Sequence, residues 1–463
     1  MSGLLALLQQ GATSLQAHQA ASATASNNLA NSNTAGYARQ RAELAADAPA
    51  ERFGDSYIGR GVVLAAVSQA RDRFVEAQLP AAIGQQMASS TESETLQGVT
   101  AIDVDKGLAP AVSNFYTQLR ALAQNPSSLN YRAAAISAAK QLAFTFNRTS
   151  TAIEGARTAI DDKLQGRLAE LNGAAAQLAR LNSEISSARA GGGEPNDLLD
   201  ARQRLGDRLA ELVGATPVAS NSGDLNLVLP DGSPLVVGSK SSTFSVQPDA
   251  TNQGHSQLLM SRPDGSVAQP LGSPPGGELG GLIAARDGAL GTASTQLDQL
   301  AFDFSSAINA VSQAGVALDG STGRSLFGGI TSVTGAARNM TLDAAIAADP
   351  NLFPAGSTNA PGDSGAVQAM VDTDQVTLSG GSTVSGVLAR ITADYGASAQ
   401  RIASISEGDS AMLSHLQGMR ESASGVSVDE EMINMQKAQR AYEAVTRVIK
   451  TADEMLDTLM SLK

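Results

Sequence analysis

The two ends of the chain carry matching patterns of apolar positions. Near the N-terminus the pattern advances in alternating steps of four and three residues, through Leu4, Leu8, Gly11, Leu15, His18, Ser22, Ala25 and Leu29. Near the C-terminus it advances in steps of three and four, through Met435, Ala438, Tyr442, Val445, Ile449, Ala452, Leu456 and Leu459. This spacing predicts two helices, each with one apolar stripe of the kind that pairs in coiled coils.

The stretch after the first helix predicts where that helix ends. Residues 25–40 hold several Asn, whose side chains compete for helix backbone hydrogen bonds, and Gly36 permits a left-handed turn. We therefore expect the helix to stop near residues 31–33. Short Gly-punctuated runs follow up to Val67, with a turn and then a strand over 57–64.

Long helical patterns occupy most of the interior of the chain. One opens at Gln69 and stops at the Gly run 191–193, and a shorter one follows Pro195 and reaches about Val213. Helical patterns resume over about 278–314 and 384–420. Between 215 and 275 the period becomes two, and two Pro-Asp-Gly-Ser turns predict hairpins.

These elements predict a mainly α protein with an inserted β-rich module, in a nested multi-domain architecture. The terminal helices pair as a coiled coil, a long-helix bundle forms the middle, and a small β domain lies outside. The expected domains are residues 1–67 together with 421–463, residues 68–214 together with 277–420, and the inserted residues 215–276. A plainer alternative is that each terminal helix caps a globular core.

Composition narrows the function classes. The chain has no Cys, which excludes disulfides, thiolate catalysis and Cys-ligated zinc. A net charge of −13 argues against nucleic acid as a partner. The first residues lack the basic start of a signal peptide, and no stretch approaches 18 apolar residues, so we expect neither a cleaved signal nor membrane insertion.

Candidate chemistry is sparse. The histidines at 18, 255 and 415 are far apart in sequence and lack a partner at ligand spacing. The chain has no Gly-x-Ser-x-Gly elbow and no His-Glu-x-x-His pair. We expect no catalytic residues, no cofactor and no metal, and hence a protein that is not an enzyme.

Two end motifs resemble a known family. The run Asn-Asn-Leu-Ala-Asn-Ser-Asn-Thr-Ala-Gly-Tyr-Ala-Arg-Gln over 27–40 resembles the N-terminal motif of the bacterial flagellar axial proteins, which form rod, hook and hook-associated structures. Residues 424–431 with the helix 432–446 resemble their C-terminal motif. The interior runs 195–202 and 280–287, with Gly214 after the first of them, are similar to the hook-associated members at the junction between hook and filament.

The resemblance implies a structural role outside the cell, in the flagellum. The terminal helices would line the inner tube of an assembly, and export would use the flagellar type III apparatus without a cleaved signal peptide. Expected partners are neighbouring subunits in a ring or tube, the hook protein, the second junction protein and an export chaperone. The implied assembly interface comprises Leu4, Leu8, Leu15, Asn27, Asn28, Leu29, Asn31, Gly36, Tyr37, Met435, Tyr442, Val445, Ile449, Leu456 and Leu459.

The chaperone contacts implied by the same resemblance are the side chains of the C-terminal stripe, namely Met435, Tyr442, Ile449 and Leu456. Two alternatives stay open. One is another axial component, in the rod or the hook. The other is a hydrolase carried on the flagellum that uses the β module.

Overall fold

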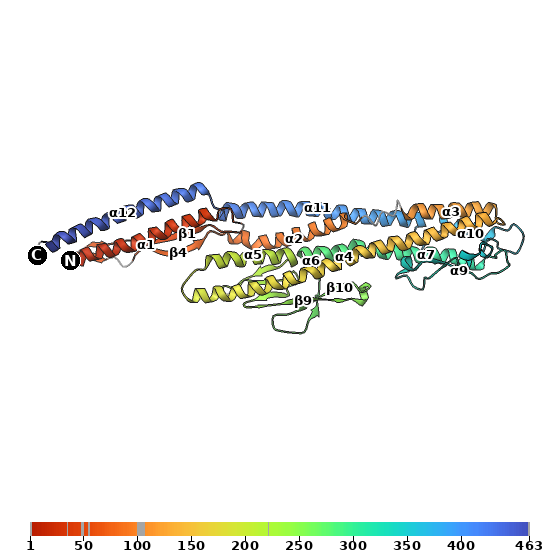
Figure 1. Cartoon of the computed structure of the whole chain (residues 1–463), viewed down its shortest axis with the longest axis horizontal. Helices are drawn as coiled ribbons and strands as arrows, with labels where there is room; N and C mark the ends of the chain where they lie inside the picture. The colour runs from red at the N-terminus through yellow and green to blue at the C-terminus, as the bar shows by residue number, and fades with distance from the viewer. Residues whose placement is uncertain are drawn as a thin grey trace.

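The computed structural model describes residues 2–34, 36–47, 51–53, 56–99, 107–220 and 222–461. The molecule is long and narrow, with its main helices aligned along one axis, and both chain ends lie together at one tip (Figure 1). Among the described helices, none has the length and apolar character needed to cross a lipid bilayer.

The first and last helices pair with each other at that tip. Helix α1 spans Ser2–Ala30 and helix α12 spans Val428–Ser461. They run antiparallel side by side (Figure 1), and α1 makes more contacts with α12 than with any other element. The predicted pairing of the terminal helices is confirmed, and α1 ends at Ala30, inside the Asn-rich stretch and next to the predicted residues 31–33.

A β-hairpin lies beside α1. Strand β1, Gln40–Ala46, pairs antiparallel with β4, Val62–Gln69, with an irregularity between Glu43 and Leu44. The short strands β2, Glu51–Phe53, and β3, Ser56–Ile58, pair between them. Sequence patterning predicted a strand near β4 but missed β1, because Gln, Arg, Ala and Glu carry little strand preference.

Long helices build the middle of the molecule, as predicted. Helix α4, Leu129–Ala190, has 62 residues and so extends for about 90 Å at the α-helical rise of 1.5 Å per residue. The other elements of this shaft are α2 Arg73–Gln97, α3 Leu108–Gln124, α5 Asn196–Val213, α6 Gly277–Ile283, the π-helical turn η2 Ala284–Leu290, α7 Gly291–Ala314 and α11 Val384–Ser424.

The far end of the shaft is closed by short elements around an aromatic cluster. Five aromatic rings meet here in edge-on or tilted pairs, each with its centroid 5.5 to 6.3 Å from at least one other: Phe115, Tyr116, Phe146, Phe304 and Phe327. The short elements are β12 Phe327–Gly328, α8 Ala336–Asn339, β13 Thr341–Leu342, α9 Ala344–Ala348, η3 Pro350–Leu352, α10 Gly365–Asp372 and η4 Thr373–Gln375.

The predicted β-rich module projects from the side of α4 (Figure 1). It holds two antiparallel sheets, with strand orders β5-β6-β7-β8 and β11-β10-β9. The strands are β5 Thr216–Val218, β6 Asn226–Val228, β7 Pro234–Val237, β8 Lys240–Ser241, β9 Thr243–Pro248, β10 Ser256–Ser261 and β11 Gln269–Pro270, with the 3-10 turn η1 at Ala250–Asn252. The two Pro-Asp-Gly-Ser segments form turns, with a positive φ of 82° at both Gly232 and Gly265.

Candidate functional site

Small residues let the two terminal helices approach closely. A Cβ atom placed on Gly11 would lie 2.5 Å from Cγ1 of Ile449, so the helix backbone at Gly11 packs directly on that side chain. Ala17 and Ala25 on α1 and Ala438 and Ala452 on α12 are all buried. The contact between α1 and α12 therefore depends on small side chains facing branched ones.

The pair leaves much apolar surface uncovered. Along α12 the exposed fractions are 53% for Val448 and 52% for Met455, and on α1 they reach 60% for Leu5. A groove of about 280 Å³ runs between the helices, lined by Leu4, Leu7, Arg447, Val448, Thr451, Ala452 and Met455. Scattered exposed apolar residues are ordinary on a protein surface, whereas here several of them line one groove.

Most of the apolar residues that the sequence singled out are half-buried, and one is exposed. Leu4, Leu8, Leu15, Leu29, Met435, Val445, Ile449 and Leu456 are half-buried at or beside the contact of α1 with α12. Tyr442 is 41% exposed. The side chain of Leu459 lies outside the described residues.

The most buried positions of α1 differ from the predicted stripe by one residue in three places. Ser14, Ala17 and Asn28 are buried, whereas the neighbouring Leu15, His18 and Leu29 are only half-buried. The reason is that both polar side chains have partners inside the fold. Ser14 Oγ accepts a hydrogen bond of 3.3 Å from the backbone N–H of Val62, next to the hairpin.

Asn28 is the centre of a polar cluster where the chain leaves α1. Its Nδ2 donates to the backbone oxygen of Gln40 at 2.8 Å, and its Oδ1 accepts from the backbone N–H of Gln40 at 2.9 Å. The hydroxyl of Tyr37 donates to the same Oδ1 at 2.8 Å. Asn28 Nδ2 also reaches Glu431 Oε2 on α12 at 3.0 Å. One fully buried amide thus joins α1, the hairpin and α12.

Arg39 extends this cluster by ion pairing. Its Nη2 lies 2.7 Å from Glu431 Oε1, and its Nη1 lies 2.7 Å from Glu430 Oε2. The Arg39 backbone N–H donates to Ser424 at the end of α11, and the Arg39 carbonyl accepts from Ala70. Because Glu431 is almost completely buried, its charge requires the guanidinium beside it. We call Asn28, Tyr37, Arg39, Gln40 and Glu431 the Asn28 cluster.

Tyr37 is held in its neutral, donating form. Burial, together with the carboxylates of Asp200, Asp197 and Glu431, raises the pKa of Tyr37 to about 12. Its hydroxyl therefore keeps its proton and donates to Asn28 at any physiological pH.

The other Asn residues of this stretch cap α1. Asn31 Nδ2 donates to the carbonyl of Asn27 at 3.0 Å and to its side-chain oxygen at 2.7 Å. Gly36 adopts a φ of +73°, the left-handed conformation expected from the sequence. These contacts end the helix and turn the chain toward the hairpin.

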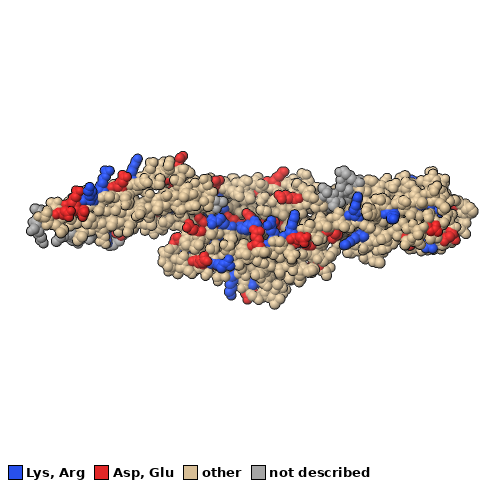
Figure 2. Space-filling view, viewed as in Figure 1, with Lys and Arg blue, Asp and Glu red and all other residues tan. Residues whose placement is uncertain are grey.

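A second set of charges forms the joint between the terminal pair and the shaft. Arg71 Nη2 lies 2.5 Å from Asp200 Oδ1 on α5, and Arg420 Nε on α11 lies 3.2 Å from Glu76 Oε1 on α2. Arg420 also pairs with Asp207 at 3.1 Å. Burial raises the pKa of both Glu76 and Asp200, although the arginines act in the opposite direction. Figure 2 shows basic and acidic side chains lying next to each other in the middle of this face.

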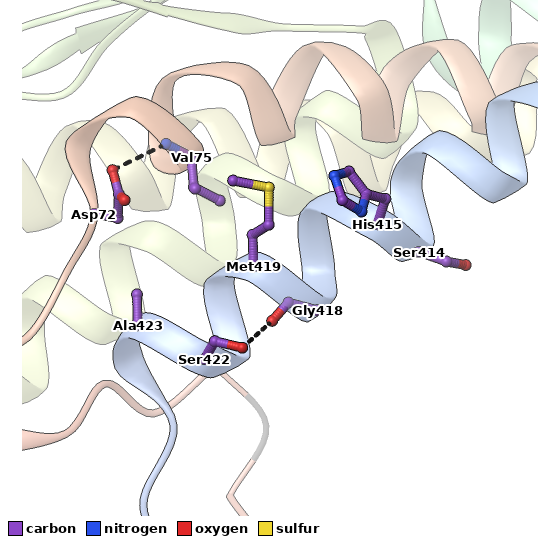
Figure 3. A pocket seen from close by; sticks show the side chains of 8 residues that line it. All are labelled: Asp72, Val75, Ser414, His415, Gly418, Met419, Ser422 and Ala423. Atoms are coloured by element: carbon purple, nitrogen blue, oxygen red, sulfur yellow. Dashed lines mark hydrogen bonds between the residues drawn. The ribbon is translucent and has the colours of Figure 1, made fainter.

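Two grooves flank the joint. A polar groove of about 770 Å³ lies between residues 31–39 and residues 417–430. In the other, of about 630 Å³, Met419 and His415 project from α11 on the side of α2, where Asp72 and Val75 lie (Figure 3). Asp72 already caps α2 by accepting from the N–H of Phe74 at 2.8 Å. Within the part of the chain that the structure describes, no three His, Asp or Glu side chains are grouped so as to hold a metal ion.

Sequence reasoning did not single out Arg39, Gln40 or Glu431 as site residues. The sequence did hold one indication of this contact. Arg39 follows the Asn run and Glu430 and Glu431 lie near the start of the last helix, so their charges are complementary. Nothing in the pattern of apolar positions could have indicated that these charges meet.

Comparisons with known proteins agree on one family. The model described as "Flagellar hook-associated protein FlgK helical domain" matches residues 94–327, and the model described as "Flagellar basal body rod FlgEFG protein C-terminal" matches residues 417–462. The chain is 26% identical to Flagellar hook-associated protein 1 of Salmonella typhimurium, with 99% of this chain and 100% of that protein covered. It is 28% identical to the protein of the same name in Bacillus subtilis, with 98% and 97% covered.

A solved structure is also similar. The match is to the flagellar hook junction protein FlgK of Burkholderia pseudomallei, with a TM-score of 0.51 and 32% sequence identity. It covers 54% of this chain and 46% of that one.

Proposed function

Because the chain belongs to the flagellar hook-associated protein FlgK family, we propose that it is a structural adaptor at the junction between hook and filament, needed for filament assembly on the hook. Membership places the protein among the structural, hook-associated components of the bacterial flagellum. The finer role, as an adaptor that receives the filament, is the proposal.

The observation that carries the proposal is the incompletely covered pair α1 and α12. The pair exposes Val448, Met455 and Leu5 and contains an apolar groove. Copies of the same pair arranged in a ring or tube would cover these side chains, since burial of apolar surface stabilises association by roughly 25 cal/mol per Å². The assembly interface would then include Leu4, Leu8, Leu15, Leu29, Met435, Tyr442, Val445, Ile449, Leu456 and Leu459, with Asn27, Asn31, Gly36 and Tyr37 near the end of α1. Asn28 is fully buried and would support this interface from inside the subunit.

The domain roles follow from the shape of the molecule. Residues 1–67 with 421–463 would form the inner tube and its connector, residues 68–214 with 277–420 the surrounding wall, and residues 215–276 the outer surface. In support, the terminal pair lies at one tip and the β module projects sideways from α4 (Figure 1). The hook protein and the second junction protein would contact opposite ends of such a ring.

Export would use the flagellar type III apparatus, with a chaperone holding the C-terminal helix before it folds. Met435, Ile449 and Leu456 are half-buried against α1, and Tyr442 is exposed. When α12 is separated from α1, these four side chains form one continuous apolar stripe. A chaperone groove that accepts an amphipathic helix would bind that stripe.

A rod or hook component is the second candidate. The observation in its favour is the match of residues 417–462 to the basal body rod model. Immunogold labelling distinguishes the two positions, because a junction protein labels only the distal end of the hook. Labelling along the rod or the hook shaft would support the second candidate.

The proposal is tested by adding charge to the exposed groove. The double variant Val448→Asp with Met455→Asp should be exported into the medium but fail to support filaments on hooks, since a charge in a covered apolar contact is strongly unfavourable. Gln436→Asp is the matched control, because it adds charge at an exposed position of the same helix. Normal filament growth in the double variant would count against an assembly role for this surface, and so would growth after deletion of residues 424–463.

A further inference from the structure

A buried charged cluster lies between the β module and the shaft, far in sequence from the terminal helices. Helix α4 contributes Glu154, Arg157 and Asp161, which lie on one face because they are three and four residues apart. The π-helical turn η2 contributes Arg286 and Asp287, and the β module contributes His255. We call these six side chains the His255 cluster.

His255 lies between two carboxylates. Its Nδ1 is 2.7 Å from Asp161 Oδ2 and its Nε2 is 3.0 Å from Glu154 Oε2, and the residue is only 6% exposed. A carboxylate oxygen accepts hydrogen bonds and a neutral imidazole carries a single N–H. Both contacts are hydrogen bonds to ionised carboxylates only when the ring carries two protons.

The carboxylate of Glu154 is held in its ionised form. Burial disfavours its charge, but hydrogen bonds from Ser294, Arg157 and His255 outweigh burial and lower the pKa of Glu154. Ser294 Oγ donates to Glu154 Oε1 at 2.8 Å. Glu154 is therefore an acceptor for the histidine rather than a donor to it.

The two arginines of the cluster are almost fully buried. Arg157 Nη1 lies 3.1 Å from Glu154 Oε1, and its Nη2 donates to Asn252 of the β module at 2.7 Å. Arg286 Nη1 bonds Asp161 and the backbone oxygen of Ser256, the latter at 2.7 Å, and its Nη2 pairs with Asp287. The three carboxylates are thus balanced by two guanidinium groups and one imidazolium. A neutral histidine would leave one carboxylate without a compensating charge, which is costly in a buried site.

Two backbone irregularities occur at the same place. Gln253 has a φ of +55°, the one positive value among the non-glycine residues that the structure describes. The turn η2 is π-helical, a geometry that usually marks a specific role within a helix. Both irregularities bring polar groups to the cluster, since Gln253 Oε1 lies 3.4 Å from Arg157 Nη1 and Asn252 Nδ2 donates to Asp287 at 2.8 Å.

Other contacts also hold the module to the shaft. Phe244, Leu258 and Met260 belong to the same apolar core as α4, and Arg202 on α5 donates to the carbonyl of Gly223 at 3.0 Å. Asn182 donates to the carbonyl of Gly238 at 2.8 Å, and Asn172 exchanges hydrogen bonds of 2.9 and 2.8 Å with the backbone of Phe244. Amide groups do not titrate in water. The module is therefore held to the shaft by an apolar core, by amide and arginine contacts, and at one further point by His255.

We propose that a doubly protonated His255 locks the orientation of the β module on the shaft, and that loss of one proton releases this end of the module while the two asparagine contacts hold the other. The groups that face the ring are Glu154 and Asp161 from α4, with Arg157 from α4 and Arg286 and Asp287 from η2 behind them. This inference does not depend on the role of the protein at the hook–filament junction.

The protonation state is tested on the intact protein by nitrogen-15 NMR of the histidine side chains at pH 7. His18 and His415 serve as internal references, and the variants His18→Gln and His415→Gln assign the remaining signal without altering the cluster. Both ring nitrogens of His255 should carry protons. A single protonated nitrogen at pH 7 would overturn the proposal, because one of the carboxyls would then hold the proton.

The mechanical consequence is tested by amide exchange at constant pH. His255→Gln supplies hydrogen-bond donors without the positive charge, and it should raise exchange over residues 249–261 by about tenfold as the local contacts open more often. Residues 225–238, beside Asn182, should exchange as in the unaltered protein. Unchanged exchange in both segments would show that the histidine charge does not hold the module. Should His255→Gln fail to fold, the NMR measurement on the unaltered chain decides the question.

Discussion

Cγ1 of Ile449 lies 2.5 Å from the position that a Cβ atom on Gly11 would take. No larger residue fits at position 11 while the Ile449 side chain stays in place, so Gly11 allows α1 and α12 to approach closely at this point. The sequence pattern includes both residues in its stripes, and the structure brings them together.

Gly11→Val should therefore separate the terminal helices. Forcing extra carbon atoms into a packed contact costs typically 1–3 kcal/mol, and a β-branched residue gains little as a helix former. Amide exchange over α1 should become faster in the purified protein. Ala12→Val is the control, since Ala12 is exposed on the same helix. Adding Ile449→Ala to the Gly11→Val variant should restore part of the protection, and equal exchange in Gly11→Val and Ala12→Val would contradict the close contact.

Asn28→Ala should weaken the contacts that the Asn28 cluster makes between α1, the hairpin and α12. The change leaves the backbone groups of Gln40, the Tyr37 hydroxyl and Glu431 without their partner, and each unpaired buried group costs about 1–3 kcal/mol. Exchange of the Gln40 amide proton reports the effect directly, because that N–H donates to Asn28.

Asn27→Ala provides the comparison for this prediction. Asn27 is exposed, and its side chain accepts only from Asn31 on the same turn. Its loss should change stability by no more than about 0.5 kcal/mol. A Gln40 amide that exchanges equally fast in both variants would show that Asn28 does not hold the hairpin.

Glu76→Gln should reduce the dependence of the free energy of unfolding on pH. The folded state raises the pKa of Glu76 above its ordinary 4.5, so the folded protein binds more protons than the unfolded chain just above that pH. The free energy of unfolding contributed by Glu76 therefore falls as the pH rises from about 4.5 toward neutrality. Relative to Glu76→Gln, the unaltered protein should gain stability when moved from pH 7 to pH 5, as measured by urea unfolding.

A loss of stability on acidification, relative to Glu76→Gln, would contradict this prediction. It would show that the attraction of Arg420 and Arg71 outweighs burial and lowers the pKa of Glu76. Arg420 lies 3.2 Å from Glu76 Oε1 and Arg71 lies 3.7 Å from Oε2, so both are close enough to compete.

The architecture was largely predictable because it depends on long periodic segments. The stripes at the two ends, the Gly run after α4 and the Pro-Asp-Gly-Ser turns each have one favoured structural outcome. Strand β1 was not predictable in this way, since Gln40–Ala46 pairs with β4 through its backbone and has no apolar alternation. Its position is set by Asn28, whose side chain bonds both backbone groups of Gln40.

The polar sites were harder to predict than the helices. Glu431 and Asn28 are separated by 403 residues, and His255 lies 101 residues from Glu154, so spacing in the sequence gives no sign of either contact. His255 was expected to be an ordinary isolated histidine, yet it lies between two carboxylates. Only the folded structure shows which acidic side chains lie next to this histidine.

The 403-residue separation between Asn28 and Glu431 also means that the contact of α1 with α12 can form only late in the making of the chain. The shaft also depends on late residues, since Ser89 on α2 bonds Asp409 on α11 across 320 residues, but all of its elements precede α12 in the chain. During synthesis, α1 therefore has no partner helix until the last residues of the chain have been made. The apolar groove between α1 and α12 can therefore exist only on a finished subunit, which would keep incomplete chains out of a growing ring.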